Sequence, residues 1–187
     1  MQSFAVFVLA VLFAPVAFAQ QRTFIVSPGA SQVAITLKTT HEIVHGAFHV
    51  ESGSVVFDRA TPKMSGLIAV SAASGNTGND SRDKKMDKDI LKVKQYATVS
   101  FAPESYTGNL APSGDSAIEV TGIFTLMGRP HAITVPMLVH LDGARATAKG
   151  HFVVPYVQWG LKNPSFLFWK ADNDVAIDLT LVGTISR

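Results

Sequence analysis

The 187-residue chain contains no cysteine, so no disulfide stabilises it and no thiolate serves as a nucleophile or metal ligand. Charge is also sparse. Only 16% of the residues are charged, and the net charge of +2 does not supply the concentrated basic face that nucleic-acid binding requires. Hydrophobic residues make up 47% of the chain, a proportion typical of a folded protein. We therefore expect one globular domain that binds no nucleic acid.

The N-terminal segment, residues 1–19, has no charged side chain and ends in Ala17-Phe18-Ala19, a small-x-small pattern that signal peptidases recognise. Its apolar run is interrupted by Pro15 and is shorter than the roughly 20 residues of a membrane-spanning helix. These features predict a cleaved signal peptide rather than an uncleaved anchor. We expect a mature domain at residues 20–187 with no membrane span. Because exported eukaryotic domains of this kind usually contain disulfides, a periplasmic or otherwise secreted bacterial protein is favoured.

Most of the remaining chain alternates between apolar and polar residues, which is typical of half-buried β-strands. Glycine, proline, asparagine and aspartate separate these segments and favour turns. Many short strands with regular turns indicate a β-sandwich or an up-and-down β-barrel. The clearest alternation gives one apolar face to Val33, Ile35 and Leu37, and another to Val175, Ile177, Leu179 and Leu181.

One segment has a helical rather than a strand pattern. Met86, Ile90 and Val93 are spaced at i, i+4 and i+7, and Asn79 or Asp80 precedes them as a possible N-cap. The sequence therefore predicts one short amphipathic helix near residues 80–93, which covers or closes one end of the β structure.

Residues 41–45 read His-Glu-Ile-Val-His and match the H-E-x-x-H zinc signature. That signature needs a helix, because only a helix brings positions i and i+4 onto one face. On a strand, at about 3.3 Å per residue, His41 and His45 would be roughly 13 Å apart and could not share one zinc ion. Neighbouring β-branched residues and Gly46 favour a strand. We expect a turn followed by the opening of a strand, not a zinc protease.

Four successive segments resemble the YceI-like family: VHGAFHVESGSVVFD, GNDSRDKKMDKDILKVKQYATVSFAP, VTGIFTLMGRPHAITVPM and WGLKNPSFLFWKADNDVAIDLTLVG. The resemblance extends from about residue 23 to the C-terminus, and Ala97 departs from it, because the family usually has proline there. It implies an all-β fold: an exported, extended, antiparallel, lipocalin-like barrel of eight strands. It also implies that the barrel lumen holds a long apolar chain, a polyisoprenoid lipid.

Aromatic side chains are the candidates for contact with a ligand in the lumen or at its rim, since an eight-stranded barrel either fills with side chains or holds one small ligand. Some of them surround the turn at Asn163-Pro164, where they either pack on the core or form a lid over a lipid tail. The candidates are Phe48, Phe57, Phe101, Phe124, Phe152, Trp159, Phe166, Phe168 and Trp169.

We therefore expect a binding or carrier protein for an isoprenoid-type lipid or another long apolar molecule, acting as a monomer or homodimer. We do not expect this protein to be an enzyme, and we expect no catalytic residue, cofactor or metal. The sequence has no G-x-S-x-G motif, and no nucleophile lies at a characteristic spacing from a general base. The alternative is a stress-protection protein or an enzyme that uses a polar or histidine-based metal site on the same barrel. Its possible ligands are His41, His45, His49, His131, His140 and His151.

The predicted helix also carries basic residues with two possible roles. They either form a solvated helix face or meet a phosphate headgroup at the mouth of the barrel. These residues are Arg82, Lys84, Lys85 and Lys88.

Overall fold

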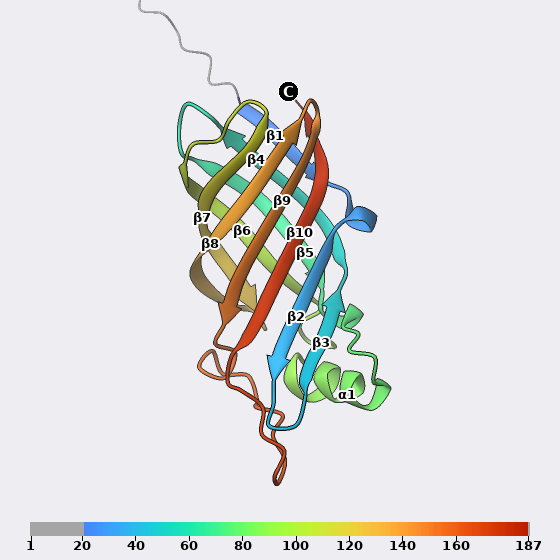
Figure 1. Ribbon diagram of the computed structural model, residues 1–187. Helices are drawn as coiled ribbons and strands as arrows, with labels where there is room; N and C mark the ends of the chain where they lie inside the picture. The colour runs from blue at the N-terminus through green and yellow to red at the C-terminus, as the bar shows by residue number, and fades with distance from the viewer. Residues whose placement is uncertain (1–20, 187) are drawn as a thin grey trace, which may run out of the picture.

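The computed structural model describes residues 21–186, so the predicted signal peptide lies outside the described residues. The described chain forms a single antiparallel sheet of ten strand segments that closes on itself (Figure 1). The segments are β1 (Gln21–Val26), β2 (Gln32–Lys38), β3 (Ile43–Phe48), β4 (Val50–Asp58), β5 (Met64–Ser71), β6 (Thr98–Gly108), β7 (Gly114–Leu126), β8 (Arg129–Asp142), β9 (Arg145–Val154) and β10 (Val175–Ser186).

The sheet is an eight-stranded barrel, because two of the strands are each interrupted once. Strand β10 pairs with β2 along one half, where Thr180 faces Gln32, and with β1 along the other half, where Thr184 faces Ile25. Strands β3 and β4 continue this arrangement by pairing with β2 and β1, respectively. A 3-10 turn, η1 (Pro28–Ala30), separates β1 from β2, and its proline lacks the N–H that a continuous ladder would need. The predicted lipocalin-like, up-and-down barrel is confirmed.

The barrel has two different ends (Figure 1). The end that holds the C-terminus and the short β8–β9 hairpin is called the upper end. The lower end holds the β2–β3 and β7–β8 connections, the helix and a long connection between β9 and β10. This connection, residues 155–174, is called the lower loop.

The apolar faces predicted from the strand pattern point into the barrel. In β2, the side chains of Val33, Ile35 and Leu37 all line the interior. The interior is tightly packed in places, because a Cβ added at Gly150 of β9 would lie 2.5 Å from Met137 Sδ of β8. The absence of a side chain at Gly150 therefore leaves room for its neighbour across the sheet.

The predicted helix is confirmed, although it is shorter than expected. Helix α1 (Asp80–Lys85) continues as a π-helical turn, η3 (Met86–Ile90). The Asn79 side chain caps its start by accepting a hydrogen bond of 3.0 Å from the Arg82 backbone N–H. The chain leaves the helix soon after Ile90, since Lys92 adopts a left-handed φ of 52°. Val93 of the predicted stripe is therefore not helical.

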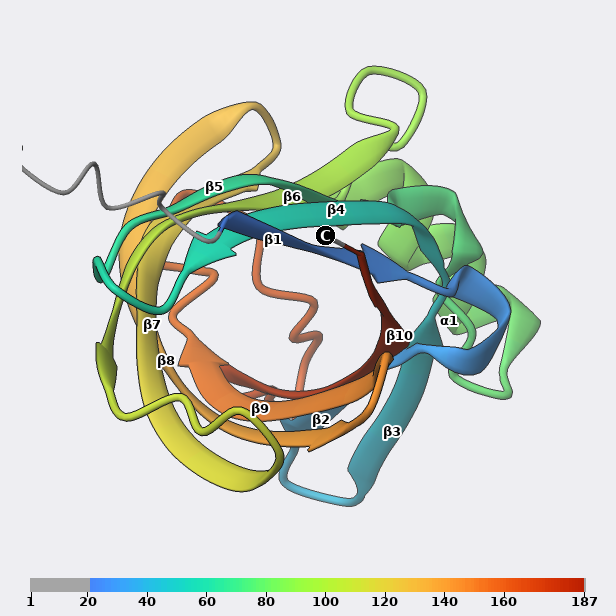
Figure 2. The same ribbon diagram turned by 90° about the horizontal axis from the view of Figure 1, so that it is seen from above.

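Helix α1 lies beside the lower part of β3 (Figures 1 and 2). There β3 pairs with β2 on one side only, and its other edge makes a bridge between Ala47 and Asn76. The segment that carries the helix thus covers a sheet edge that would otherwise be open. Among residues 21–186, no helix is long and apolar enough to span a bilayer.

Candidate functional site: an apolar cavity in the barrel

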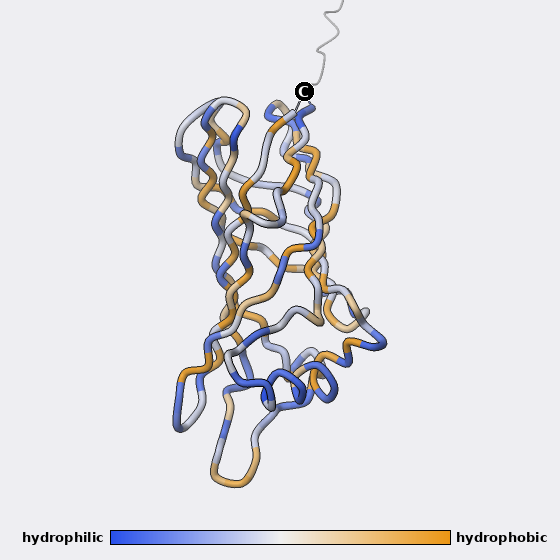
Figure 3. Tube along the Cα trace, turned by 90° about the vertical axis from the view of Figure 1, so that its right-hand side faces the viewer, coloured by the Kyte–Doolittle hydropathy of each residue, from blue (hydrophilic) through white to orange (hydrophobic). Residues whose placement is uncertain are grey.

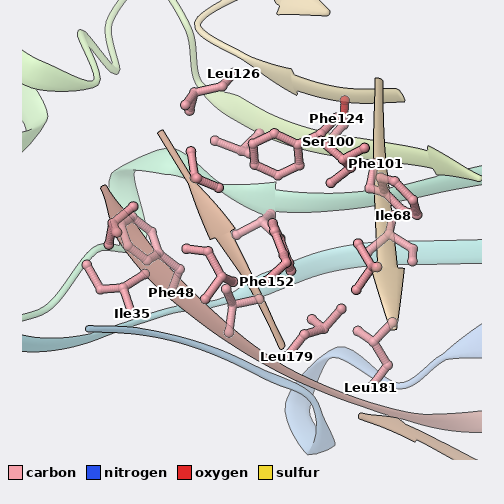
Figure 4. A pocket seen from close by; sticks show the side chains of 18 of the residues that line it. Ile35, Phe48, Ile68, Ser100, Phe101, Phe124, Leu126, Phe152, Leu179 and Leu181 are labelled. Carbon is pink, nitrogen blue, oxygen red and sulfur yellow. The ribbon is translucent and has the colours of Figure 1, made fainter. Parts of the chain in front are cut away.

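A cavity of about 670 Å³ occupies the barrel interior, within the usual size range of small-molecule sites. Nearly all of its wall is aliphatic or aromatic, and the side chains come from all the strands. Figure 4 shows Phe101, Phe124 and Phe152 converging on this space from β6, β7 and β9. Such a wall favours apolar molecules without fixing their orientation, since the hydrophobic effect is non-directional.

The cavity opens at the lower end. Three of its lining residues are exposed to solvent, and all three lie at that end: Ser81 and Lys85 on α1, and Phe166 on the lower loop. At the upper end, in contrast, Phe57 and Leu141 of the wall are 5% and 3% exposed. A ligand would therefore enter between α1 and the lower loop, a region that we call the mouth.

Two basic side chains, Arg82 and Lys85, are the only charged residues among the described residues that line the cavity. The Arg82 guanidinium is held in place, because Nε donates to Thr77 Oγ1 at 2.8 Å and Nη1 donates to Glu42 Oε1 at 2.9 Å. Lys85 Nζ donates only a longer bond, of 3.3 Å, to the Pro164 carbonyl. Because Glu42 compensates the charge of Arg82, Lys85 supplies the positive charge at the mouth that would attract an anionic group at the end of an apolar ligand.

Seven of the nine predicted aromatic residues lie on the cavity wall. Five of them come from barrel strands, and the other two come from the lower loop, where they border the mouth. They are Phe48, Phe57, Phe101, Phe124, Phe152, Phe166 and Trp169. Their contact with a ligand stays a prediction.

The other two aromatic candidates lie outside the wall. The Trp159 indole stacks on the His131 ring, with centroids 3.8 Å apart and planes at 6°. It also packs behind Phe124, at a centroid distance of 5.9 Å, and so supports the wall from outside the cavity. Phe168 is 88% exposed on the lower loop.

The candidate residues named from the sequence are all aromatic and do not include the aliphatic part of the wall. Ile35, Ile68 and Leu179 line the cavity beside the phenylalanines (Figure 4). The period-two alternation had already placed Ile35 and Leu179 on an apolar face, so the signal was present in the sequence. No comparable signal marked Thr77, whose place at the mouth depends on the loop before α1.

The His-Glu-Ile-Val-His segment forms a turn and the start of β3, as predicted. The Thr39 hydroxyl stabilises the turn by donating to the Glu42 carbonyl at 2.7 Å. Glu42 points to Arg82, and His45 is an exposed residue of β3 with Nδ1 3.3 Å from Thr36 Oγ1. Glu42 therefore joins the β2–β3 turn to helix α1 rather than acting as a general base beside a metal.

The strand histidines do not converge on a common centre. His140 and His151 each pair with a carboxylate, Asp115 at 2.6 Å and Asp178 at 2.8 Å, respectively. Both pairs are largely solvent-exposed. Within residues 21–186, no group of three or more His, Cys, Asp or Glu side chains is arranged to hold a metal ion. The histidine-based metal alternative therefore has no geometric support in this part of the chain.

A buried tyrosine fixes the base of the lower loop. The Tyr156 side chain is 6% exposed, and its hydroxyl donates to the Asp172 carbonyl at 2.6 Å. Burial, with smaller contributions from the Asp172 and Asp174 carboxylates, raises the pKa of Tyr156 to about 12. The phenol is therefore neutral near pH 7 and holds together the two ends of the loop.

Comparison with solved structures gives the same fold. The crystal structure of BcnA from Burkholderia cenocepacia is 24% identical, with a TM-score of 0.69, and the match covers 85% of this chain and 99% of BcnA. A polyisoprenoid binding domain from Saccharophagus degradans, implicated in plant cell wall breakdown, is 16% identical, with a TM-score of 0.67 and coverage of 87% and 98%. The Campylobacter jejuni YCEI protein is 13% identical, with a TM-score of 0.57 over 100% of both chains. These likenesses show the fold.

The family assignment comes from the sequence profile. No curated protein matches the chain. The profile of the YceI-like domain matches residues 24–183 of the 187-residue chain. This stretch contains the helix and, apart from the first residues of β1 and the last residues of β10, the whole barrel. The chain therefore belongs to the YceI-like family.

Proposed function

We propose that this chain is a non-enzymatic binding or carrier protein for a long apolar molecule of the polyisoprenoid type. The observation that carries the proposal is an apolar cavity of about 670 Å³ with one mouth. One structure of the same fold is described as a polyisoprenoid binding domain, which supports this ligand class. The tail lies in the lumen and the polar end lies at the mouth.

The physical basis is the transfer of hydrocarbon out of water. Each buried methylene contributes about 0.8 kcal/mol, so an isoprenoid tail needs no hydrogen-bonding partner in the lumen. The wall offers few polar groups, and one of them, Ser100, lies near the start of β6 at the lower end (Figure 4). A headgroup buried deep in the barrel would lose its hydration, whereas at the mouth it stays close to water, Arg82 and Lys85.

The proposal includes export. Residues 1–19 have the pattern of a signal peptide, and a carrier of water-insoluble lipid is useful in an aqueous compartment bordered by membranes. We therefore place the mature protein in the periplasm or outside the cell. N-terminal mass determination on protein from that compartment should give a chain that begins at Gln20.

Extraction of bound lipid tests the proposed function. Folded protein purified from its native compartment without detergent should yield, after organic extraction and mass spectrometry, about one prenyl-type lipid per chain. Protein from the same cells that has been unfolded and refolded in lipid-free buffer is the control and should yield none. Well-folded native protein that gives no stoichiometric apolar compound would contradict the proposal.

A further inference from the structure

The lower loop projects beyond the rest of the lower end (Figure 1). Its outermost residues, 166–169, are called the tip. The tip is Phe-Leu-Phe-Trp. Phe166, Leu167 and Phe168 are 68%, 68% and 88% exposed. Figure 3 shows hydrophobic residues at this outermost point of the molecule.

The tip differs from the other exposed apolar residues of the described chain. Those residues, Ile25, Ile43, Leu67, Leu138 and Val153, lie on five different strands of the barrel wall. Scattered single residues of this kind are normal on protein surfaces. Three consecutive ones at the end of a projecting loop form a contiguous apolar patch, and such a patch marks an interaction site.

The tip is held out by specific contacts. Phe166 and Trp169 exchange two backbone hydrogen bonds of 2.9 Å each, which close the tip into a tight turn. Closer to the barrel, the Thr40 N–H donates to the Lys170 carbonyl at 2.9 Å, and Asn163 Nδ2 donates to the Ala171 carbonyl at 3.1 Å. Exposure of the tip is therefore part of the folded arrangement.

The charged side chains nearest to the tip along the lower loop are basic, whereas its acidic residues, Asp172 and Asp174, lie at the base of the loop. Between residues 157 and 171 the only charged side chains are Lys162 and Lys170, which flank the tip on both sides and are both exposed. Lys85 of α1 reaches the same loop through its bond to the Pro164 carbonyl. Aromatic residues between lysines suit the interface of an anionic bilayer, where the rings enter the headgroup region and the lysines meet phosphates.

We propose that the tip inserts into the surface of an anionic lipid bilayer and so places the mouth of the cavity against the membrane. Phe166 and Trp169 belong both to the tip and to the cavity wall. A lipid tail leaving the bilayer would therefore meet an apolar path from the membrane into the lumen. The use of this contact for lipid transfer rests on the proposed function, whereas the membrane contact itself does not.

Vesicle co-sedimentation tests the proposal. The exported protein, with its N-terminus verified, is mixed with vesicles of phosphatidylglycerol and phosphatidylcholine in equal parts, or of phosphatidylcholine alone. Wild-type protein should bind the anionic vesicles. Phe168→Ser should weaken this binding about tenfold or more, because a large apolar side chain no longer enters the interface. Leu138→Ser is the matched control, since Leu138 is 65% exposed on the wall of β8 and should leave binding unchanged.

The lysines give a second arm. Replacing both Lys162 and Lys170 by glutamine should weaken binding to anionic vesicles at least tenfold and reduce the preference over phosphatidylcholine, with Lys85 of the mouth left in place. Binding by wild type that is no stronger than by Phe168→Ser would overturn the proposal. It would also be overturned if Phe168→Ser left vesicle binding intact but abolished a concentration-dependent dimer in sedimentation velocity, because the tip would then contact a second copy.

Lipid extraction separates this inference from the proposed function. Phe168 does not line the cavity, so lipid-free Phe168→Ser incubated with a prenyl lipid in the absence of vesicles should yield the wild-type amount on extraction while losing vesicle binding. Vesicle binding by a protein that carries no lipid would support the membrane contact and remove the carrier function. A protein that carries one lipid per chain but does not bind vesicles would support the carrier function and overturn the membrane contact.

Discussion

The two ends of the barrel are built from the same kind of apolar residue but are used differently. At the upper end, Phe57 and Leu181 are 5% and 2% exposed and belong to the largest cluster of buried residues. At the lower end, Phe166 of the same cavity wall is 68% exposed, and two basic residues of the wall, Arg82 and Lys85, lie at this end as well. The upper end therefore stabilises the fold, and the lower end is where we propose that a ligand enters and that the protein contacts a membrane.

The polar residues show the same contrast. At the upper end, the buried Asp58 carboxylate accepts a bond of 2.8 Å from the Ala60 N–H, and the Asp58 carbonyl accepts one of 2.9 Å from the Tyr106 hydroxyl. The first bond closes a short turn after β4, and the second joins this turn to β6, so these polar groups satisfy each other within the protein. At the lower end, Lys85 has only a single long bond to a carbonyl, so its charge remains available to an external group.

The largest predicted difference concerns stability. Phe57→Ala should lower the free energy of unfolding by roughly 3–5 kcal/mol, because it removes a buried aromatic side chain at the closed end. Phe166→Ala should change it by less than about 0.5 kcal/mol, since the ring is mostly in solvent, yet it should reduce the extracted lipid. Denaturant unfolding and lipid extraction of the two variants measure both quantities. If Phe166→Ala lowers the free energy of unfolding as strongly as Phe57→Ala does, and loses lipid as well, Phe166 is an ordinary core residue.

A second prediction tests whether the ligand occupies the lumen. Ala148→Trp places an indole inside the cavity, whose wall includes Ala148, and should reduce the extracted lipid at least about tenfold. Stability should fall by no more than about 1–3 kcal/mol, the usual cost of overpacking. Ala132→Trp is the matched control, because Ala132 is exposed on β8. Unchanged lipid in a folded Ala148→Trp variant would place the ligand outside the barrel.

The smallest predicted effect compares the tyrosines of the two ends. Tyr156→Phe removes one buried hydrogen bond and should cost about 1 kcal/mol at pH 7. The folded-state pKa of about 12 is higher than the ordinary value of 10.0. Tyr156 therefore stabilises the fold fully below pH 10, and this contribution is lost as the pH rises towards 12.

Urea unfolding between pH 8 and pH 12 checks this dependence. The wild type should lose more stability over that range than Tyr156→Phe, which has no phenol to ionise. Tyr106→Phe is the counterpart at the upper end, where burial also raises the tyrosine pKa. Parallel pH profiles for the wild type and Tyr156→Phe would show that this phenol does not titrate in the predicted way.

Local patterns predicted the elements well. The alternation placed Ile35 and Leu179 correctly on the inner face, and the i, i+4 spacing of Met86 and Ile90 predicted a helix whose apolar side lines the cavity. The β-branched surroundings of His45 correctly argued for a strand. These predictions succeed because facing and periodicity depend on residues a few positions apart.

Predictions that depend on distant contacts were less complete. Trp159 and Trp169 lie ten residues apart in the same aromatic-rich segment, and for both the sequence left open whether they pack on the core or form a lid. Trp159 stacks on His131 of β8, and only Trp169 reaches the cavity. The residues near each tryptophan in the sequence do not distinguish the two, because the position of each side chain depends on contacts with strands and loops far away along the chain.

The sequence by itself determined the family, the strand and helix segments and which faces are apolar, because these follow from short-range patterning and family motifs. Only the tertiary structure decided that the barrel interior keeps a cavity and that the cavity opens beside α1. It also decided that the tip of the lower loop projects into solvent. The physical reason is that barrel closure, the break between β1 and β2, and contacts such as Thr40 to Lys170 join residues far apart in the chain.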